Sequence, residues 1–318
     1  NPQIISKDFG QDPDFEFLPI DSFLGRTRAF LKVQDGCESF CSYCIVPYAR
    51  GPQRSLDQDK VIRMLERLSA AGYKEIVLTG IHLGKYGIES DGDEGLKGLL
   101  RRIGKQGLPV RIRLSSLEPT EIDQELIEMV VSEEWLCSHF HVPLQSGDNG
   151  ILKKMNRTYT SEEFVGIIEL IHRMLPLAAI GVDVMAGFPG EDKNAHRNSY
   201  SLIKALPISY LHVFPFSPRK GTPAGDFPGQ VGQSVIKERA GELRELGKEK
   251  RSVFHKLCLG REFPVLTEGW VSNNEKMIKG LSDNYLRVTF PSSRLVRNRL
   301  VIVRIEEVGG DRVMGKPA

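Results

Sequence analysis

The sequence has few of the residues that crosslink a small protein or anchor it in a membrane. It holds five cysteines among 318 residues, and its aromatic residues make up 8%. So few cysteines exclude a scaffold held together by disulfide bonds. The apolar runs fall short of the roughly 20 residues that a membrane-spanning helix needs, and the first residues lack the pattern of a signal peptide. We therefore expect a globular protein of the cytoplasm without a membrane partner.

What remains is the composition of an ordinary folded chain, long enough for two domains. The net charge of +2 is unevenly distributed. Residues 1–218 hold 24 Lys and Arg against 29 Asp and Glu, a net of −5, whereas residues 219–318 hold 19 against 12, a net of +7. A basic C-terminal part predicts a unit that binds a polyanion. The alternative is chance scatter of surface charge.

Residues 1–25 have the texture of a linker. Pro2, Pro13 and Pro19 interrupt this segment, several acidic residues lie among them, and no apolar period is sustained. The sequence also begins at Asn1 instead of a methionine. We expect this chain to be part of a longer one.

Short apolar runs alternate with helical periods between residues 26 and 232. The expected strands are Ala29–Val33, Glu75–Leu78, Val110–Leu114, Ser138–Val142, Ile180–Val184 and Leu211–Phe214. The expected helices are 57–71, 94–104, 121–132, 161–173 and 194–205. This alternation predicts an α/β fold with a parallel sheet. A doubly wound sheet and a partial barrel both fit the pattern, and both place active loops at the carboxyl ends of the strands.

The texture changes after residue 232. A long charged helix is expected at 233–257, connecting the first domain to the rest. Residues 258–318 then show alternation typical of short strands, as in Leu286, Val288 and Phe290. We expect a small antiparallel β barrel there.

Three of the five cysteines lie within eight residues. Cys37, Cys41 and Cys44 have the spacing Cys-x3-Cys-x2-Cys, and they directly follow the first expected strand. Three thiolates on such a loop suit three corners of a cubane iron–sulfur cluster, with the fourth iron left open. A structural zinc site normally needs four protein ligands, and no fourth Cys or His lies nearby in the sequence. The alternative is a zinc site completed from elsewhere.

Several segments besides the cysteine loop carry a resemblance. Tyr43 precedes the third cysteine, and the loop resembles the signature of the radical S-adenosylmethionine (SAM) enzymes. The surrounding segments resemble the methylthiotransferases of that superfamily; they are residues 34–37, 45–51, 141–147, 154–157, 187–191 and 216–222. Residues 78–84 (LTGIHLG) and 115–119 (SSLEP) are similar to the branch that acts on N6-threonylcarbamoyladenosine in tRNA.

The resemblance implies a fold, a chemistry and partners. The fold would be a partial (βα)6 barrel at 26–232, followed by an RNA-binding barrel of the TRAM kind at 258–318. The cofactors would be a 4Fe–4S cluster and SAM, whose reductive cleavage gives a 5′-deoxyadenosyl radical. The reaction would be methylthiolation beside the anticodon, with tRNA as substrate and flavodoxin or ferredoxin as electron donor. Methylthiotransferases also carry an N-terminal domain with a second 4Fe–4S cluster, which this chain lacks.

Candidate site residues follow from these roles. For SAM we expect contacts near the cluster and at the strand ends, from Tyr43, Ile45, Gly80, Ser116, Glu118, Gln145 and Asp183. Glu118 has an alternative role at the start of a helix, and Asp183 in binding buried backbone donors. The predicted substrate contacts are cations, namely Arg50, Arg219, Lys276, Lys279, Arg287, Arg294, Arg297 and Arg299. The sequence around position 56 departs from the family, since Arg54-Ser55-Leu56 stands where Arg-Ser-Arg is usual.

Other interpretations compete with this one. The same chemistry on isopentenyl-modified adenosine or on an Asp of a ribosomal protein is a near alternative. A non-catalytic iron–sulfur or zinc module that binds RNA is an alternative of another class. His139 and His141 alternate on one expected strand, but no carboxylate near them in sequence completes a metal site. We therefore expect these two histidines to be polar lining.

Overall fold

The structure is a computed structural model that describes residue 15 and residues 26–89, 94–271, 274–294, 297–310 and 312–318. The predicted linker at 1–25 lies outside the described residues except for Phe15. None of the described helices combines the length and apolar character that crossing a membrane requires.

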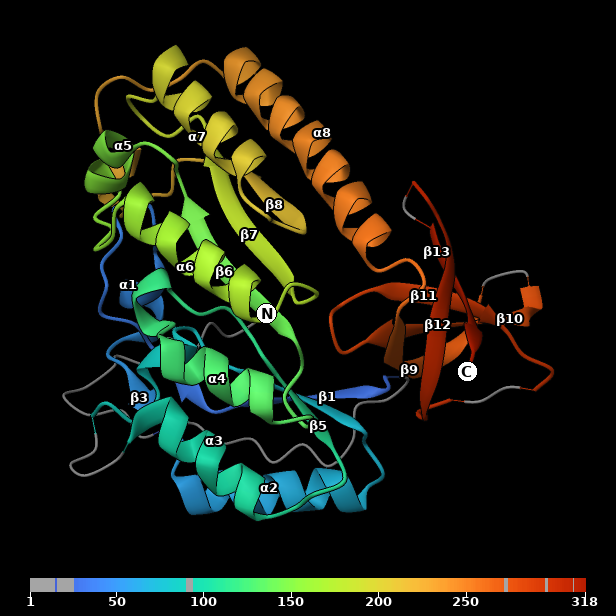
Figure 1. The fold of residues 1–318 in the computed structure, drawn as a ribbon. Coiled ribbons are helices and arrows are strands. Elements are labelled where there is room, and N and C mark those ends of the chain that lie inside the picture. Colours follow the sequence, from blue (N-terminus) through green and yellow to red (C-terminus); the bar gives the residue numbers. More distant parts are fainter. Residues whose placement is uncertain (1–14, 16–25, 90–93, 272–273, 295–296, 311) are drawn as a thin grey trace, which may run out of the picture.

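An incomplete barrel of six parallel strands forms the first part of the fold (Figure 1). In spatial order the strands are β1 (Arg28–Lys32), β4 (Glu75–Thr79), β5 (Arg111–Leu114), β6 (His139–Gln145), β7 (Ala179–Ala186) and β8 (Tyr210–Pro215). A single bridge between Ile112 and Leu136 joins the two three-stranded sheets. Spatial order follows chain order throughout, without the reversal that a doubly wound sheet requires. The predicted partial barrel is therefore confirmed.

Helices cover the outer face of this barrel because alternate strand residues point outward and are apolar. They are α2 (Gln58–Ala70), α3 (Gly95–Lys105), α4 (Gln124–Ser132), α6 (Ser161–Met174) and α7 (Lys193–Ala205). Ile112 and Leu114 of β5, for example, are buried in the core that these helices complete. Each of these helices had been predicted from its apolar period.

Several short elements had not been predicted. They are α1 (Val46–Arg50), α5 (Asn149–Lys154), the two-residue ladder of β2 (Gln34–Asp35) and β3 (Arg54–Ser55), and the 3-10 turns η1 (Leu83–Lys85), η2 (Pro119–Glu121) and η3 (Pro223–Gly225). Elements this short carry no period in the sequence. All of them lie in loops that follow strands of the barrel, and they shape the site described below.

The C-terminal part is a closed barrel of five strands reached through α8 (Gln233–Leu257). The strands are β9 (Glu262–Val271), β10 (Asn274–Ser282), β11 (Arg287–Pro291), β12 (Leu300–Gly309) and β13 (Arg312–Pro317), in the closed order β10-β11-β13-β12-β9. The predicted small barrel is confirmed, but the expectation of wholly antiparallel pairing was wrong. β11 and β13 pair in parallel. A closed barrel with an odd number of strands requires at least one parallel pair, because directions cannot alternate all the way round.

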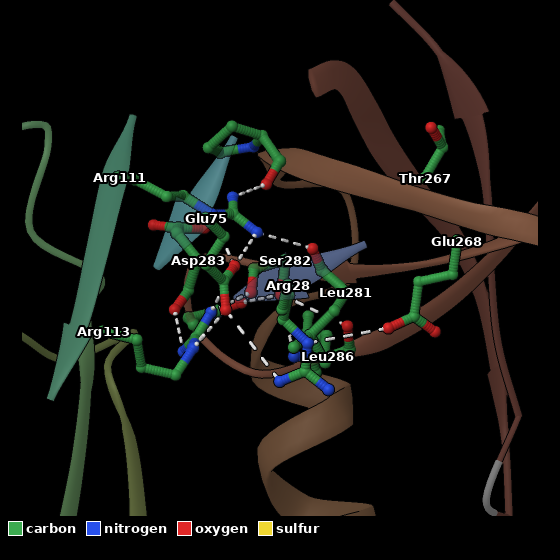
Figure 2. A network of polar contacts seen from close by, with 12 residues as sticks. Arg28, Glu75, Arg111, Arg113, Thr267, Glu268, Leu281, Ser282, Asp283 and Leu286 are labelled. Atoms are coloured by element: carbon green, nitrogen blue, oxygen red, sulfur yellow. Dashed lines mark hydrogen bonds and ion pairs between the residues drawn. The ribbon is translucent and has the colours of Figure 1, made fainter. Parts of the chain in front are cut away.

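A buried charge network joins the two barrels (Figure 2). Glu75, at the start of β4, is fully buried and accepts hydrogen bonds from the Nε atoms of Arg111 and Arg113, each at 2.8 Å. The same guanidinium groups donate onward to backbone carbonyls of the C-terminal barrel. Arg111 reaches Pro264 at 2.6 Å and Leu281 at 2.8 Å. One carboxylate therefore orients two arginines whose remaining hydrogens all point into the other domain.

The turn between β10 and β11 extends this junction. Arg113 donates to the carbonyls of Ser282 at 2.9 Å and Asp283 at 2.8 Å. The ring of Tyr285 stacks on His139, with ring centroids 4.4 Å apart. Glu75 and His139 are the first residues of their strands, so the C-terminal barrel covers the amino ends of the strands. The carboxyl ends, where active loops belong, lie at the opposite end.

The junction makes the stability of the protein sensitive to acid. Burial raises the pKa of Glu75, but the charges of Arg113 and Arg111 outweigh it and lower the pKa from 4.5 to about 2. A carboxyl group with a lowered folded-state pKa stabilises the fold above its unfolded pKa and stops doing so as the pH falls toward the folded one. We expect Glu75 to contribute about 3 kcal/mol that disappears between pH 4.5 and 2. Urea unfolding at pH 7, 4 and 3 measures the loss.

The variant Glu75→Gln isolates this contribution, because Asp183 has a lowered pKa in the same range. Its free energy of unfolding should decline less steeply below pH 4.5 than that of the unchanged protein. Equal pH slopes would contradict the role given to Glu75.

Candidate functional site

The cysteine loop lies at the carboxyl end of β1, between β2 and α1. Gly36 opens it with φ +74°, and a Cβ there would stand 1.8 Å from the carbonyl oxygen of Pro52. Only glycine fits such a conformation and such a contact. The amide of Cys37 donates to the carbonyl of Gly51 at 3.1 Å. The residues on either side of the loop thus hold its entry in one conformation.

The segment after α5 holds the middle of the loop. Ser42 donates its amide to Met155 at 3.0 Å and its hydroxyl to Lys154 at 2.8 Å. The side chain of Asn156 donates to the carbonyls of Ser39 and Phe40, both at 3.1 Å. The sequence Lys-Met-Asn-Arg at 154–157, noted above only for its resemblance, is therefore a clamp on the cysteine loop.

Arg157 completes the clamp at the buried cysteine. Its guanidinium donates to Sγ of Cys41 at 3.3 Å and forms an ion pair with Glu118. It also lies over the ring of Tyr159, 4.9 Å from the centroid, and donates to the Tyr159 hydroxyl. That hydroxyl in turn donates to the carbonyls of Pro143 and Leu144 at the end of β6. The carboxyl ends of β5 and β6 thereby position the donor to a thiolate.

His82 attends the first cysteine. Its Nδ1 lies 3.6 Å from Sγ of Cys37, and its Nε2 lies 2.5 Å from a carboxylate oxygen of Glu121. Burial works against protonation, but the contacts with Cys37 and Glu121 prevail and raise the pKa of His82 to about 9. Burial also raises the pKa of Cys37, yet the hydrogen bonds from His82 and Ser39 outweigh it and lower that pKa. The surroundings therefore favour a thiolate at position 37.

The three thiols suit a cluster better than a single ion. The pKa of Cys44 is raised, first by burial and then by the charges of Cys41 and Cys37, so the thiolates repel one another and a cationic group would relieve them. A single zinc ion would hold its sulfur ligands about 3.8 Å apart, given a Zn–S distance of about 2.3 Å. Within the described part of the chain, His141, Asp183 and His212 are the set of three ligand groups whose atoms all lie within 4.8 Å, and the cysteines are not such a set. Their wider spacing fits ligands that each bind a different iron.

The residues predicted to contact SAM surround this loop in part. Tyr43 is half-buried, with its ring edge against Phe188 at 6.5 Å. Ile45 is 38% exposed beside the loop. Gln145 ends β6 in a left-handed conformation with φ +61°, at a bulge in that strand. Glu118 stands at the start of η2, the helix role left open above, and it also pairs with Arg157.

The glycine at position 80 has a different explanation from the predicted one. A Cβ at Gly80 would lie 2.9 Å from Oε1 of Gln34, which accepts a hydrogen bond from the amide of His82 at 2.7 Å. Glycine is needed for this packing, which places His82 over the cysteine loop. The approach of a cofactor is not required to explain it.

Ser116 and Asp183 belong to a separate cluster inside the barrel. The hydroxyl of Ser116 lies 2.7 Å from Nδ1 of His141, and Nε2 of His141 lies 2.9 Å from Oδ1 of Asp183. Nδ1 of His212 lies 3.2 Å from the same oxygen. The expectation that no carboxylate completes a metal site with the histidines of β6 was wrong. The carboxylate comes from β7 and the second histidine is His212 of β8, whereas His139 points into the junction.

The predicted substrate cations lie in separate places. Arg50 is exposed at the end of α1, 3.9 Å from a carboxylate oxygen of Asp35. Arg219 is exposed in the segment after β8, and that segment reaches the cysteine loop because the amide of Ala224 donates to Ser42 at 2.8 Å. These two cations are thus at the cysteine-loop end of the barrel.

The six cations of the C-terminal barrel are exposed, and the structure brings some of them together. Lys276 lies beside the connection before β12, since its carbonyl accepts from the amide of Ser292 at 2.9 Å, and Arg294 follows in that connection. Arg299 is held there by Thr267. Arg287 instead lines a cavity of about 390 Å³ together with Arg251 of α8. The remaining two, Lys279 and Arg297, are exposed on β10 and in the connection before β12.

Sequence reasoning missed several residues of the site. His82, Glu121, Arg157 and His212 all contact a cysteine or a predicted cofactor residue, or lie beside one that does. His82 and Arg157 stood within segments that carried the family resemblance, so those segments were the available signal. Nothing in the sequence marked His212.

Comparisons with known proteins agree with this geometry. Among curated proteins, the chain is 39% identical over 298 residues to the threonylcarbamoyladenosine tRNA methylthiotransferase MtaB of Bacillus subtilis, covering 93% of this chain and 66% of that protein. It is 36% identical over 315 residues to the MtaB of Chlamydia pneumoniae, covering 99% and 73%. It is 35% identical over 304 residues to the tRNA-2-methylthio-N(6)-dimethylallyladenosine synthase of Natranaerobius thermophilus, covering 94% and 66%. The chain thus spans about two thirds of the length of these relatives.

Solved structures share the fold. Coproporphyrinogen III oxidase (HemN) of Escherichia coli matches with a TM-score of 0.54 at 11% identity, over 71% of this chain and 53% of that one. The methyltransferase TsrM of Kitasatospora setae matches with a TM-score of 0.53 at 21% identity, over 62% and 38%. The family described as the radical SAM superfamily matches residues 31–203, which include the cysteine loop and most of the barrel. The chain belongs to the radical SAM superfamily.

Proposed function

We propose that this chain carries the radical-generating and RNA-binding parts of a tRNA methylthiotransferase. Its substrate would be N6-threonylcarbamoyladenosine beside the anticodon, and its product the 2-methylthio derivative. The observation that carries the proposal is the clamped cysteine loop at the carboxyl ends of the strands. The MtaB relatives at 36–39% identity supply the substrate class.

Cys37, Cys41 and Cys44 would hold a 4Fe–4S cluster, which supplies the electron for reductive cleavage of SAM when both are bound. The chain's own residues do the rest. Arg157 stabilises charge on the Cys41 sulfur, and His82 does so for Cys37. Such donors tune a cluster through hydrogen bonds to its sulfurs. The packed aromatic ring of Tyr43 keeps one side of the loop dry.

The contacts to SAM remain proposals. Tyr43, Ile45, Glu118 and Gln145 stand around the loop and would bind the cofactor there, with Gly80 allowing His82 its place. Ser116 and Asp183 already hydrogen-bond to His141, and they would have to share these contacts with the cofactor. A second cluster would belong to an N-terminal domain outside this chain.

The RNA would be held by the C-terminal barrel, which we propose to be a TRAM domain at 258–318. The other divisions proposed are a linker at 1–25, the radical SAM barrel at 26–232 and a connecting helix at 233–257. Cations position phosphates without reading sequence, and Lys276, Arg294 and Arg299 lie close enough along one connection to do so together. Lys279, Arg287 and Arg297 would add contacts. The reductant would be flavodoxin or ferredoxin, and the compartment the cytoplasm.

Two other functions stay in view. The relative from Natranaerobius thermophilus favours dimethylallyl-modified adenosine as an alternative substrate. Nothing comparable supports an Asp of a ribosomal protein. A non-catalytic RNA-binding module would need the cysteine loop but not the histidine and arginine that attend its sulfurs.

Binding of defined RNAs tests the substrate. Anticodon stem–loops carrying N6-threonylcarbamoyladenosine, dimethylallyladenosine or plain adenosine at the same position are titrated into the chain with its cluster reconstituted. We expect the first to bind at least about 10-fold more tightly than the others, because a site that pairs with polar groups rejects analogues lacking them. A stem–loop with the modified base moved to another loop position is the matched control. Preference for the dimethylallyl form would establish the alternative, and equal binding of all three would refute recognition by this chain.

A further inference from the structure

The cluster of His141, Asp183 and His212 has the spacing of a metal site. The nitrogen and oxygen atoms of the three side chains all lie within 4.8 Å of one another. Two of the separations are 2.9 and 3.2 Å. Tetrahedral zinc with Zn–N and Zn–O distances of about 2.0–2.2 Å spaces its ligands about 3.3 Å apart. The atoms are therefore already close to the positions that such an ion imposes.

The residues come from three neighbouring strands and are fixed there. Asp183 of β7 pairs with Pro143 of β6 and with His212 of β8 in the sheet register. A parallel sheet thus brings two imidazoles and one carboxylate to one level of the barrel. The side chains of His141 and Asp183 are 14% and 17% exposed, whereas that of His212 is 50% exposed. The site is held on one side and open on the other.

Ser116 gives His141 the orientation of a ligand. Its hydroxyl occupies Nδ1 of His141 at 2.7 Å, which leaves Nε2 facing Asp183. Histidines that bind metal ions usually direct their other ring nitrogen to such a partner. Gly181 adds space beside the site, because a Cβ there would lie 2.1 Å from Cζ of Tyr210. The ring of Tyr210 can therefore lie against His141, with centroids 6.2 Å apart.

We propose that His141, Asp183 and His212 bind a divalent transition-metal cation of the zinc type, separate from the cysteine cluster. Two imidazoles and one carboxylate with open positions form a donor set that suits zinc or ferrous iron. His212 also lines the cavity of about 390 Å³ beside α8. The open positions take water or an oxygen-bearing anion there, and Arg251 and Arg287 line the same cavity. The proposal does not depend on the methylthiotransferase function.

The test removes the competing cluster and measures metal uptake directly. The variant Cys37→Ala/Cys41→Ala/Cys44→Ala is stripped with a chelator and titrated with Zn²⁺, then with Co²⁺ in parallel. We expect one zinc per chain by elemental analysis, and visible absorption bands from Co²⁺ in a site of low symmetry. Uptake well below one ion per chain at saturating metal would overturn the proposal. No part of this measurement uses SAM, tRNA or catalytic activity.

Substitutions in the same background locate the ion. His212→Phe, at a half-exposed position that tolerates the change, should weaken zinc binding at least about 100-fold. Ser116→Ala should weaken it about 10- to 100-fold, as expected for a residue that only orients a ligand. His172→Phe on α6 is the matched control and should bind zinc normally. Unchanged binding in the His212 variant would show that the ion lies elsewhere, and it would refute the assignment.

Discussion

Replacing Glu75 by glutamine should lower the free energy of unfolding at pH 7 by about 3–5 kcal/mol. The carboxylate is fully buried and is the acceptor for Arg111 and Arg113, with Arg28 at 3.9 Å. Glutamine keeps the shape but removes the negative charge, so buried arginines are left without a counter-ion. Breaking a buried ion pair from one side costs this much because the remaining charge is uncompensated. Urea unfolding followed by circular dichroism measures the loss.

Two comparisons make that result specific. Glu245→Gln removes a carboxylate whose pair with Lys248 is exposed, and it should cost less than about 1 kcal/mol. The Glu75 variant should also release the C-terminal barrel, so that protease cuts the chain near residues 258–261 sooner than in the unchanged protein. A loss below 1 kcal/mol with unaltered proteolysis would show that the junction does not depend on this charge.

Replacing Cys41 by alanine should abolish reductive cleavage of SAM. Cys41 is the buried member of the three and accepts a hydrogen bond from Arg157. Without it, one iron of the cluster has no protein ligand. Changes to groups that merely support a ligand cost 10- to 100-fold, so loss of the ligand should cost at least about 100-fold. The measurement is 5′-deoxyadenosine formed after anaerobic reconstitution with iron and sulfide and reduction with dithionite.

Cys258→Ala is the matched control. Cys258 is also buried, but it packs in the core of the C-terminal barrel and lies 3.6 Å from the side chain of Asn284. This variant should retain about four irons per chain, as a 4Fe–4S cluster requires, together with the full rate of cleavage. If the Cys41 variant cleaves SAM as fast as this control, the cysteine loop is not the radical site.

The barrel was predictable because its strands and long helices each repeat an apolar period. Helix α1, with five residues, and α5, with six, are too short to show one. The parallel pairing of β11 with β13 was equally invisible, since pairing between strands distant in sequence depends on closure of the barrel. The junction did leave a signal that was overlooked. Arg111 and Arg113 alternate with buried Ile112 and Leu114, which is unusual for a strand inside a domain.

The candidate site divides in the same way. The cysteines were predictable because all three ligands stand within eight residues. The group of His141, Asp183 and His212 was not, because its members are 42 and 29 residues apart and meet only across neighbouring strands. Arg157 is 116 residues from the sulfur it contacts. Local spacing reveals a site that one loop can build, whereas a site assembled by the sheet requires the topology.

The junction through Glu75 also turns the molecule into a ruler. It fixes the C-terminal barrel at the amino ends of strands that are five to eight residues long, and the cysteine loop stands at their carboxyl ends. At about 3.3 Å per residue, these ends are roughly 16–26 Å apart. An RNA gripped at Lys276 and Arg294 therefore offers to the cysteine loop only a nucleotide that lies a set distance from the gripped phosphates. Such a molecule would select its target by position along the RNA, before any base is read.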